Sequence, residues 1–237
     1  MSSITVFTSI TASKDNLIED QCKGNAKFVA FTDRPIESKT WEVRPVYDRF
    51  KSDRRNSRIV KMLPHLYCDT EYSIWIDGSS RLLITPEEIV ERFLKEHDIG
   101  LFKHPSRDCL YDEAIVCAKW KLDDPEVIIE QVKTYEDKGF AKHKGLCECG
   151  FIVRRHTPEV EAFNNAWWAE YCRYSCRDQI SFMHAIDSVG IRINAIKIGW
   201  TTENLPDGKQ RQFKGNVIEM MQHLTDRPEP SYKSFKN

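Results

Sequence analysis

The chain lacks several features that would assign it to a simple class of protein. No apolar run reaches the roughly 18 residues that a membrane-spanning helix needs, and no basic stretch followed by a long apolar run opens the chain. We therefore expect a protein without a transmembrane segment or secretory signal, placed in the cytoplasm. Neither charge sign dominates, with 35 Lys plus Arg against 36 Asp plus Glu. This balance argues against a general binder of nucleic acid or acidic membranes and favours a discrete ligand.

The middle of the chain has no linker rich in Gly, Ser or Pro, and no internal repeat. A length of 237 residues is compatible with one large α/β domain. We predict a single domain over 1–225, followed by a polar tail over 226–237. Oligomeric state is not predicted.

Eight cysteines are present, and without a secretory signal we expect them to remain thiols. Cys147 with Cys149 and Cys172 with Cys176, together with nearby His143, are candidate zinc ligands. A single residue between the first two sulfurs is a poor spacing for a tetrahedral ion, since structural sites usually present pairs separated by two to four residues. A zinc-stabilised interaction domain is therefore an alternative hypothesis rather than the favoured one.

Short apolar segments alternate with segments of helical spacing, which is typical of an α/β fold with a mostly parallel central sheet flanked by helices. Expected strands are 4–8, 27–31, 41–46, 72–76, 99–102, 149–154 and 191–198, and expected helices are 53–66, 85–97, 124–138, 157–168 and 178–189. Pro64 should end or kink the first helix early. Thr85-Pro86-Glu87-Glu88 is a typical helix start, with a capping residue, a proline and acids in the first turn.

The segment from Tyr72 to Ser79 carries the clearest functional signal. An apolar strand ends in Asp77 on a Gly-Ser turn, and ligands of open α/β sheets bind beyond the carboxyl ends of the strands. Such an Asp can reach a metal bound to phosphate, although a strand-ending Asp also serves as an ordinary turn residue. His104 and Arg107 follow another strand and should reach the same edge.

Three separated motifs, in order and with the matching spacing, resemble a known family. They are Tyr-Ser-Ile-Trp-Ile-Asp-Gly at 72–78, His-Pro-Ser-Arg at 104–107 with Tyr-Asp-Glu-Ala at 111–114, and Arg-Asp-Gln-Ile-Ser-Phe at 177–182. Over roughly 32–190 the chain resembles the glycosyltransferase-like family of plant pectin and mucilage synthesis, long described as a domain of unknown function. The resemblance implies a GT-A fold, which is a Rossmann-like fold that transfers sugars from nucleotide diphosphates with the help of Mn²⁺ or Mg²⁺.

The metal site departs from the usual GT-A pattern. GT-A enzymes hold the cation with Asp-x-Asp, whereas Asp77-Gly78-Ser79 supplies only the first acid. The resemblance leaves two possibilities open. Either Asp77 holds the metal with help from a distant residue, for which His223 is the candidate, or cations such as Arg58, Lys61 and Arg107 stabilise the phosphates without a metal.

For the donor, the resemblance and the strand ends point to Thr8 and Asp33 near the base and ribose, and to Arg58, Lys61, His104 and Arg107 near the phosphates. The basic residues on the helix after Asp53 are more often simply solvated. His104 and Arg107 have the alternative of an ordinary charged loop.

For the acceptor and the chemistry, the resemblance points to Asp178 and Gln179 with Asp77 as catalytic residues, and to Glu113, Trp167 and Arg177 as acceptor-binding residues. Asp178 would contact a sugar, or act as the base if the reaction inverts the anomeric centre, and Gln179 would bind a sugar hydroxyl. Each has a structural alternative. Asp178 suits the first turn of a helix, Glu113 can pair with Arg107, and Trp167 can belong to the core.

The sequence therefore predicts a glycosyltransferase that moves a sugar, from UDP in preference to other nucleotides, to a saccharide acceptor. The missing second acid motivates the alternative of a non-catalytic relative that binds a nucleotide or sugar. Donor sugar, acceptor and stereochemical outcome are not predicted.

Overall fold

The computed structural model describes residues 3–206 and 210–221. Within them, seven strands form one sheet in the order β3-β2-β1-β4-β7-β6-β8. The strands are β1 (Ile4–Ile10), β2 (Lys27–Thr32), β3 (Glu42–Pro45), β4 (Tyr72–Ile76), β6 (Ile99–Lys103), β7 (Cys147–Arg155) and β8 (Asn194–Ile196). Only β7 among them runs antiparallel to its neighbours, β4 and β6. The predicted mostly parallel central sheet is confirmed. His223 and the expected tail over 226–237 lie outside the described residues.

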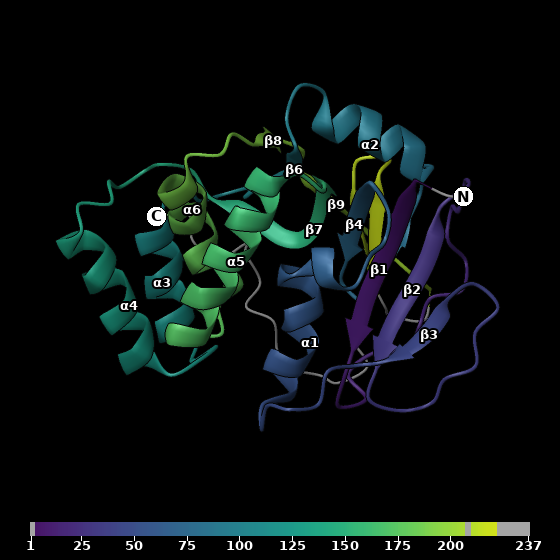
Figure 1. The fold of residues 1–237 in the computed structure, drawn as a ribbon, viewed down its shortest axis with the longest axis horizontal. Helices are drawn as coiled ribbons and strands as arrows, with labels where there is room; N and C mark the ends of the chain where they lie inside the picture. Colours follow the sequence, from purple (N-terminus) through teal and green to yellow (C-terminus); the bar gives the residue numbers. More distant parts are fainter. Residues whose placement is uncertain (1–2, 207–209, 222–237) are drawn as a thin grey trace.

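Both faces of this sheet are covered (Figure 1). One face packs against α1 (Asp53–Met62), α5 (Pro158–Arg173) and α6 (Asp178–Val189), while α2 (Pro86–Leu94) lies on the other. Adjacent strand residues alternate between the faces: Phe7 and Trp75 belong to the first core, Val6 and Ile74 to the second. The sequences of these strands are nearly continuous in apolar residues because both faces of the strands are buried.

A second sheet lies on the α2 side and was not predicted. It has four antiparallel strands in the order β5-β11-β10-β9, within the described part of the chain. They are β5 (Ser80–Leu82), β9 (Trp200–Asn204), β10 (Gln210–Lys214) and β11 (Ile218–Met221). Leu82 and Ile218 extend the core beneath α2. The short β5 begins three residues after Asp77, so this sheet borders the carboxyl end of β4.

A helical group lies at the end of the molecule opposite β1, β2 and β3 (Figure 1). It contains α3 (Leu110–Lys119), which was not predicted, and α4 (Pro125–Asp137). Its small hydrophobic core includes Tyr135 of α4 and Ile180 of α6. Helix α3 packs against α6, which brings Glu113 near Arg177 at the start of α6. None of the helices in the described residues has both the length and the apolar character that crossing a membrane requires.

Local sequence signals account for several element ends. The first helix stops at Met62, and a short 3-10 turn, η1 (Pro64–Leu66), begins at Pro64, as the proline predicted. At α2, Thr85 and Glu88 form a reciprocal capping box. The expected strand over 191–198 is wrong in extent, since only Asn194–Ile196 pairs with β6.

Candidate functional site

Asp77 directly follows β4, and its position is fixed from two sides. Its backbone N–H donates to the Gly150 carbonyl at 3.0 Å, and the Trp75 indole Nε1 donates to its Oδ1, also at 3.0 Å. The other oxygen, Oδ2, faces Gly150, where an added Cβ would lie 3.2 Å away. The Asp77 side chain is 27% exposed. The carboxylate is thus oriented through one oxygen, while the other faces Gly150, which has no side chain.

Asp178 begins α6 and is held by the basic side of α1. Its Oδ2 accepts a hydrogen bond from Lys61 Nζ at 2.5 Å and lies 3.8 Å from Arg58 Nε. Burial alone would raise the pKa of this carboxyl. Lys61, Arg58 and Arg177 outweigh burial and hold the pKa of Asp178 well below its usual range.

Arg58 lies between the two carboxylates. Its Nη1 is 4.0 Å from Asp77 Oδ1, and its guanidinium carbon lies 5.7 Å from the centre of the Trp75 ring. Arg58 and Lys61 are one helical turn apart and therefore share a face of α1. That face points into the protein: the Lys61 side chain is 1% exposed and the Arg58 side chain 22%. The alternative that these two cations form a solvated helix side is therefore wrong.

Asp77 fits the demands of a hard divalent cation, which prefers carboxylate oxygen together with phosphate and water. Gly150 matters for this fit because any side chain there would fill the space at Asp77 Oδ2. The buried Asp15 also lies in this region, with its Oδ2 3.5 Å from the point where a Cβ on Gly78 would stand. The sequence did not single out Asp15, because its loop carries no motif and only the fold brings it to Gly78.

The 104–113 motif forms a compact network rather than an open set of ligands. Arg107 donates through Nε to Glu113 Oε2 at 2.8 Å, which confirms the structural alternative of this pair. His104 is 4% exposed, and its Nδ1 accepts the backbone N–H of Arg107 at 2.9 Å. Burial, followed by the charge of Arg107, lowers the pKa of His104 to about 4. His104 in its neutral form therefore holds the backbone of this loop, and its predicted contact with the donor stays a prediction.

Several other predicted site residues are buried. Trp167 has no exposed surface, so its ring cannot stack on a sugar; instead its Nε1 donates to the Asp178 carbonyl at 3.1 Å. Thr8 is 1% exposed and Glu113 2%, so neither offers its side chain to a ligand here. The Lys61 ammonium faces Asp178 rather than open space.

Gln179 and Arg177 lie next to Asp178 and keep partial exposure. Gln179 uses its Nε2 to donate to the Cys147 carbonyl at 3.1 Å, which fixes the start of α6 to β7. Although burial opposes it, the neighbouring Cys117, Asp178 and Glu113 raise the pKa of Arg177. Arg177 therefore links the Asp178 side of the site to the Arg107 network.

Asp33 lies apart from this centre, at the carboxyl end of β2. It lines a surface pocket of about 280 Å³ with Thr32, Arg34 and residues of β3. Its Oδ2 accepts the backbone N–H of Ala12 at 2.6 Å, so it also fixes the loop after β1. The pocket and the Asp77 centre lie at the same edge of the parallel strands β1, β2 and β4.

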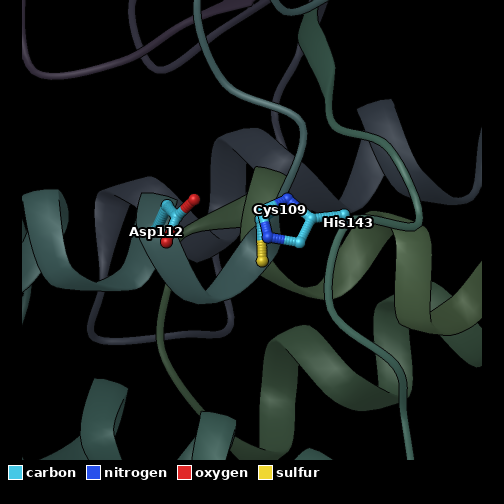
Figure 2. A group of neighbouring side chains, drawn as sticks. All are labelled: Cys109, Asp112 and His143. Carbon is cyan, nitrogen blue, oxygen red and sulfur yellow. The ribbon is translucent and has the colours of Figure 1, made fainter.

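The cysteine cluster proposed for zinc is wrong. Cys147 and Cys149 are buried in the core on the α5 face. In the part of the chain that the structure describes, these two residues do not join Cys172, Cys176 and His143 in a group with metal-ligand spacing. His143 instead lies with Cys109 and Asp112 (Figure 2).

The fold is similar to that of a known sugar transferase. The solved apo structure of the bifunctional glycosyltransferase WbbM matches with a TM-score of 0.51 at 14% identity, covering 82% of this chain and 39% of that one. At this identity the similarity shows the fold alone.

Two Arabidopsis thaliana proteins match the sequence. The "Probable hexosyltransferase MUCI70" is 32% identical over 73% of this chain, and the "Alkaline ceramidase TOD1" is 27% identical over 58%. The chain spans about a third of the length of each, 31% and 32% respectively. The model of the TOD1/MUCI70 glycosyltransferase-like domain matches residues 19–215. With this match across most of its length, the chain belongs to the TOD1/MUCI70 glycosyltransferase-like domain family.

Proposed function

We propose that this protein is a glycosyltransferase that takes a sugar from a nucleotide diphosphate, UDP in preference to others, and transfers it to a saccharide acceptor. The observation that carries the proposal is the arrangement of Asp77, Arg58 and Asp178. Two carboxylates from different elements face one guanidinium, at 4.0 Å and 3.8 Å, beyond the carboxyl end of β4. Ligands of open α/β sheets bind at this edge.

The arrangement matches the charge distribution of a sugar donor. A leaving diphosphate develops negative charge, and a partly exposed guanidinium can bind its oxygens through two parallel hydrogen bonds. Arg58 is suited to this because it is held by carboxylates on both sides and stacked over Trp75. Asp178 lies closer to Lys61 than to Arg58, at 2.5 Å against 3.8 Å, so a bound diphosphate would compete with the two carboxylates for Arg58.

Mn²⁺ or Mg²⁺ bound at Asp77 would supply Lewis-acid stabilisation of the leaving diphosphate. Asp77 would hold it through the oxygen beside Gly150, with the Trp75 indole fixing the orientation of the carboxylate. Asp15 is a further oxygen donor in the same region.

Asp178 is proposed to bind and orient a sugar hydroxyl rather than to remove its proton. A general base works best when its pKa is near the working pH, and the neighbouring cations hold the pKa of Asp178 well below its usual range. The carboxylate can still accept a hydrogen bond from a hydroxyl. The pocket lined by Asp33 and Arg34 is proposed for the base or ribose of the donor.

Calorimetric titration of UDP and GDP, with and without Mn²⁺, tests the donor site. We expect metal-dependent binding of UDP that disappears in Asp77→Asn, which keeps the shape but removes the charge. Asp69→Asn is the matched control, because Asp69 precedes the same strand at its opposite end and its side chain is 82% exposed. Absence of binding by either nucleotide to the folded wild type contradicts the proposal.

Turnover separates the transferase from its alternatives. Incubation with UDP-sugars should release UDP in a metal-dependent reaction that depends on Asp77. Binding of UDP without any release supports the non-catalytic relative instead. Because one relative is named a ceramidase, a parallel incubation with ceramide should show no free sphingoid base, and its release would favour amide hydrolysis over sugar transfer.

A further inference from the structure

Three side chains with metal-ligating atoms meet at the start of α3, away from Asp77. They are Cys109, Asp112 and His143, and one ligand atom of each lies within 4.8 Å of the others. Figure 2 shows the three side chains gathered there. Cys109 is 1% exposed, while Asp112 and His143 are exposed. A buried sulfur thus lies beneath two ligands that are open to solvent.

The local structure fixes the first two ligands. Cys109 is the N-cap residue of α3, and Asp112 follows three positions later, so both lie on the same face of the first turn. The pair therefore has little freedom to separate. The third ligand, His143, comes from the segment between α4 and β7, far from this pair in the sequence.

His143 is oriented by a second carboxylate. Its Nδ1 lies 2.8 Å from Asp108 Oδ1, which leaves Nε2 for another partner. Ligating histidines in metalloproteins typically make such a bond from their other ring nitrogen to a carboxylate. The segment is also tied by its backbone, because the Gly145 N–H donates to the Asp108 carbonyl at 2.9 Å.

We propose that Cys109, Asp112 and His143 bind one Zn²⁺, with water as the fourth ligand and Asp108 holding the histidine. A set of thiolate, imidazole and carboxylate suits zinc better than Mg²⁺ or Mn²⁺, which prefer oxygen alone. Tetrahedral zinc with ordinary bond lengths places its ligand atoms about 3.5 Å apart. The ligand atoms lie within 4.8 Å of one another, so the exposed Asp112 and His143 side chains would have to rotate to reach that spacing.

The ion would join two segments that are separate in sequence. It would connect the start of α3 to the 140–145 segment, next to which the His104 N–H donates to the Leu146 carbonyl at 2.8 Å. A crosslink of this kind stabilises the folded state, because the unfolded chain has no preformed site. The role proposed for the ion is to stabilise this part of the fold, and its ligands are distinct from the residues of the proposed donor site at Asp77.

Zinc content and affinity test the proposal directly. We expect one Zn²⁺ per chain after dialysis against zinc and removal of the unbound ion. His143→Gln should lower the affinity more than about a hundredfold, and Asp108→Asn about ten- to a hundredfold, as for other second-sphere changes. Cys172→Ser is the control, since Cys172 belongs to the rejected cysteine cluster. Circular dichroism confirms that each variant is folded.

Two further measurements identify the ligands. Co²⁺ in place of zinc should give a thiolate-to-metal charge-transfer band in wild type and Cys172→Ser but not in Cys109→Ser. Zinc should also slow tryptic cleavage at the exposed Lys142 and Lys144, and His143→Gln should remove this protection. No zinc bound to the folded wild type, or zinc retained at full affinity by His143→Gln and Asp112→Asn, overturns the proposal. Because none of these readouts needs a sugar donor, the result is independent of the transferase proposal.

Discussion

Lys61 and Asp178 lie 117 positions apart in the sequence, yet the lysine ammonium donates to the aspartate carboxylate at 2.5 Å. The Lys61 side chain is 1% exposed and the Asp178 side chain 15%. Aromatic rings flank the ammonium, with the centres of the Trp75 and Trp167 rings at 5.4 and 6.0 Å. The pair fixes the start of α6 to α1, and so sets the distance between Asp178 and the Asp77 strand.

Removing the charge of only one partner of this pair should lower the free energy of unfolding. Lys61→Met leaves a largely buried carboxylate without its nearest cation, and we expect a loss of about 3 kcal/mol in the free energy of unfolding. The double variant Lys61→Met with Asp178→Asn should lose less than the sum of the single losses, because it leaves no unpaired charge. Urea unfolding of the four proteins measures this coupling. Additive losses would mean that the pair contributes nothing.

Gly150→Ala tests the space beside Asp77. The new Cβ would stand 3.2 Å from Asp77 Oδ2, so we expect Mn²⁺-dependent affinity for UDP to fall at least about tenfold, which corresponds to about 1.4 kcal/mol. Gly199→Ala is the matched control, since no atom lies within 4 Å of its added Cβ. Calorimetry measures both. Unchanged UDP affinity in Gly150→Ala would show that the cation does not use this oxygen.

The sequence predicted the sheet better than the site, for a physical reason. Apolar strands, the Thr85 capping box and the break at Pro64 are local signals, and the structure confirms them. The second sheet depends on pairing between β5 and β11, which are far apart in the chain. Its exposed strands are short and polar, so they carry no strong pattern.

The motifs located the site region, but not which of their side chains face outward. His104 belongs to one motif and Trp167 precedes another, and both side chains hydrogen-bond to the backbone of the site loops. Arg58 and Lys61 share a helix face, yet only Arg58 keeps enough exposure to meet a ligand. Burial of this kind depends on how α1 packs between α5 and the sheet. A sequence pattern alone does not determine it.

Stability should fall as the pH drops from 7 to 5, and His156 should contribute. Burial, followed by the charges of Arg154 and His65, lowers the pKa of His156 to about 4, from an ordinary value near 6.5. The unfolded chain therefore takes up a proton between these values that the folded protein does not, so stability present above pH 6.5 is lost towards pH 4. Glutamine at this position can keep the contact with Ser73 Oγ but takes up no proton. We therefore expect the free energy of unfolding of His156→Gln to fall by about 1 kcal/mol less than that of the wild type between pH 7 and pH 5. Urea unfolding at pH 7 and pH 5 measures it, and parallel losses in both proteins would contradict the assignment.

Arg107 and Glu113 allow a structural role to be separated from donor binding. Arg107 donates to the buried Glu113 carboxylate, whose Oε1 also accepts from Cys117 Sγ at 3.4 Å. Arg107→Lys keeps the charge but loses the Nε contact, so we expect about 1–2 kcal/mol less stability in urea unfolding. We expect the pair to be only structural, so UDP affinity should change less than twofold in Arg107→Lys. Arg58→Lys should instead lower UDP affinity and leave the free energy of unfolding nearly unchanged. A large loss of UDP affinity in Arg107→Lys, with unfolding unchanged, would instead place Arg107 in contact with the donor phosphates.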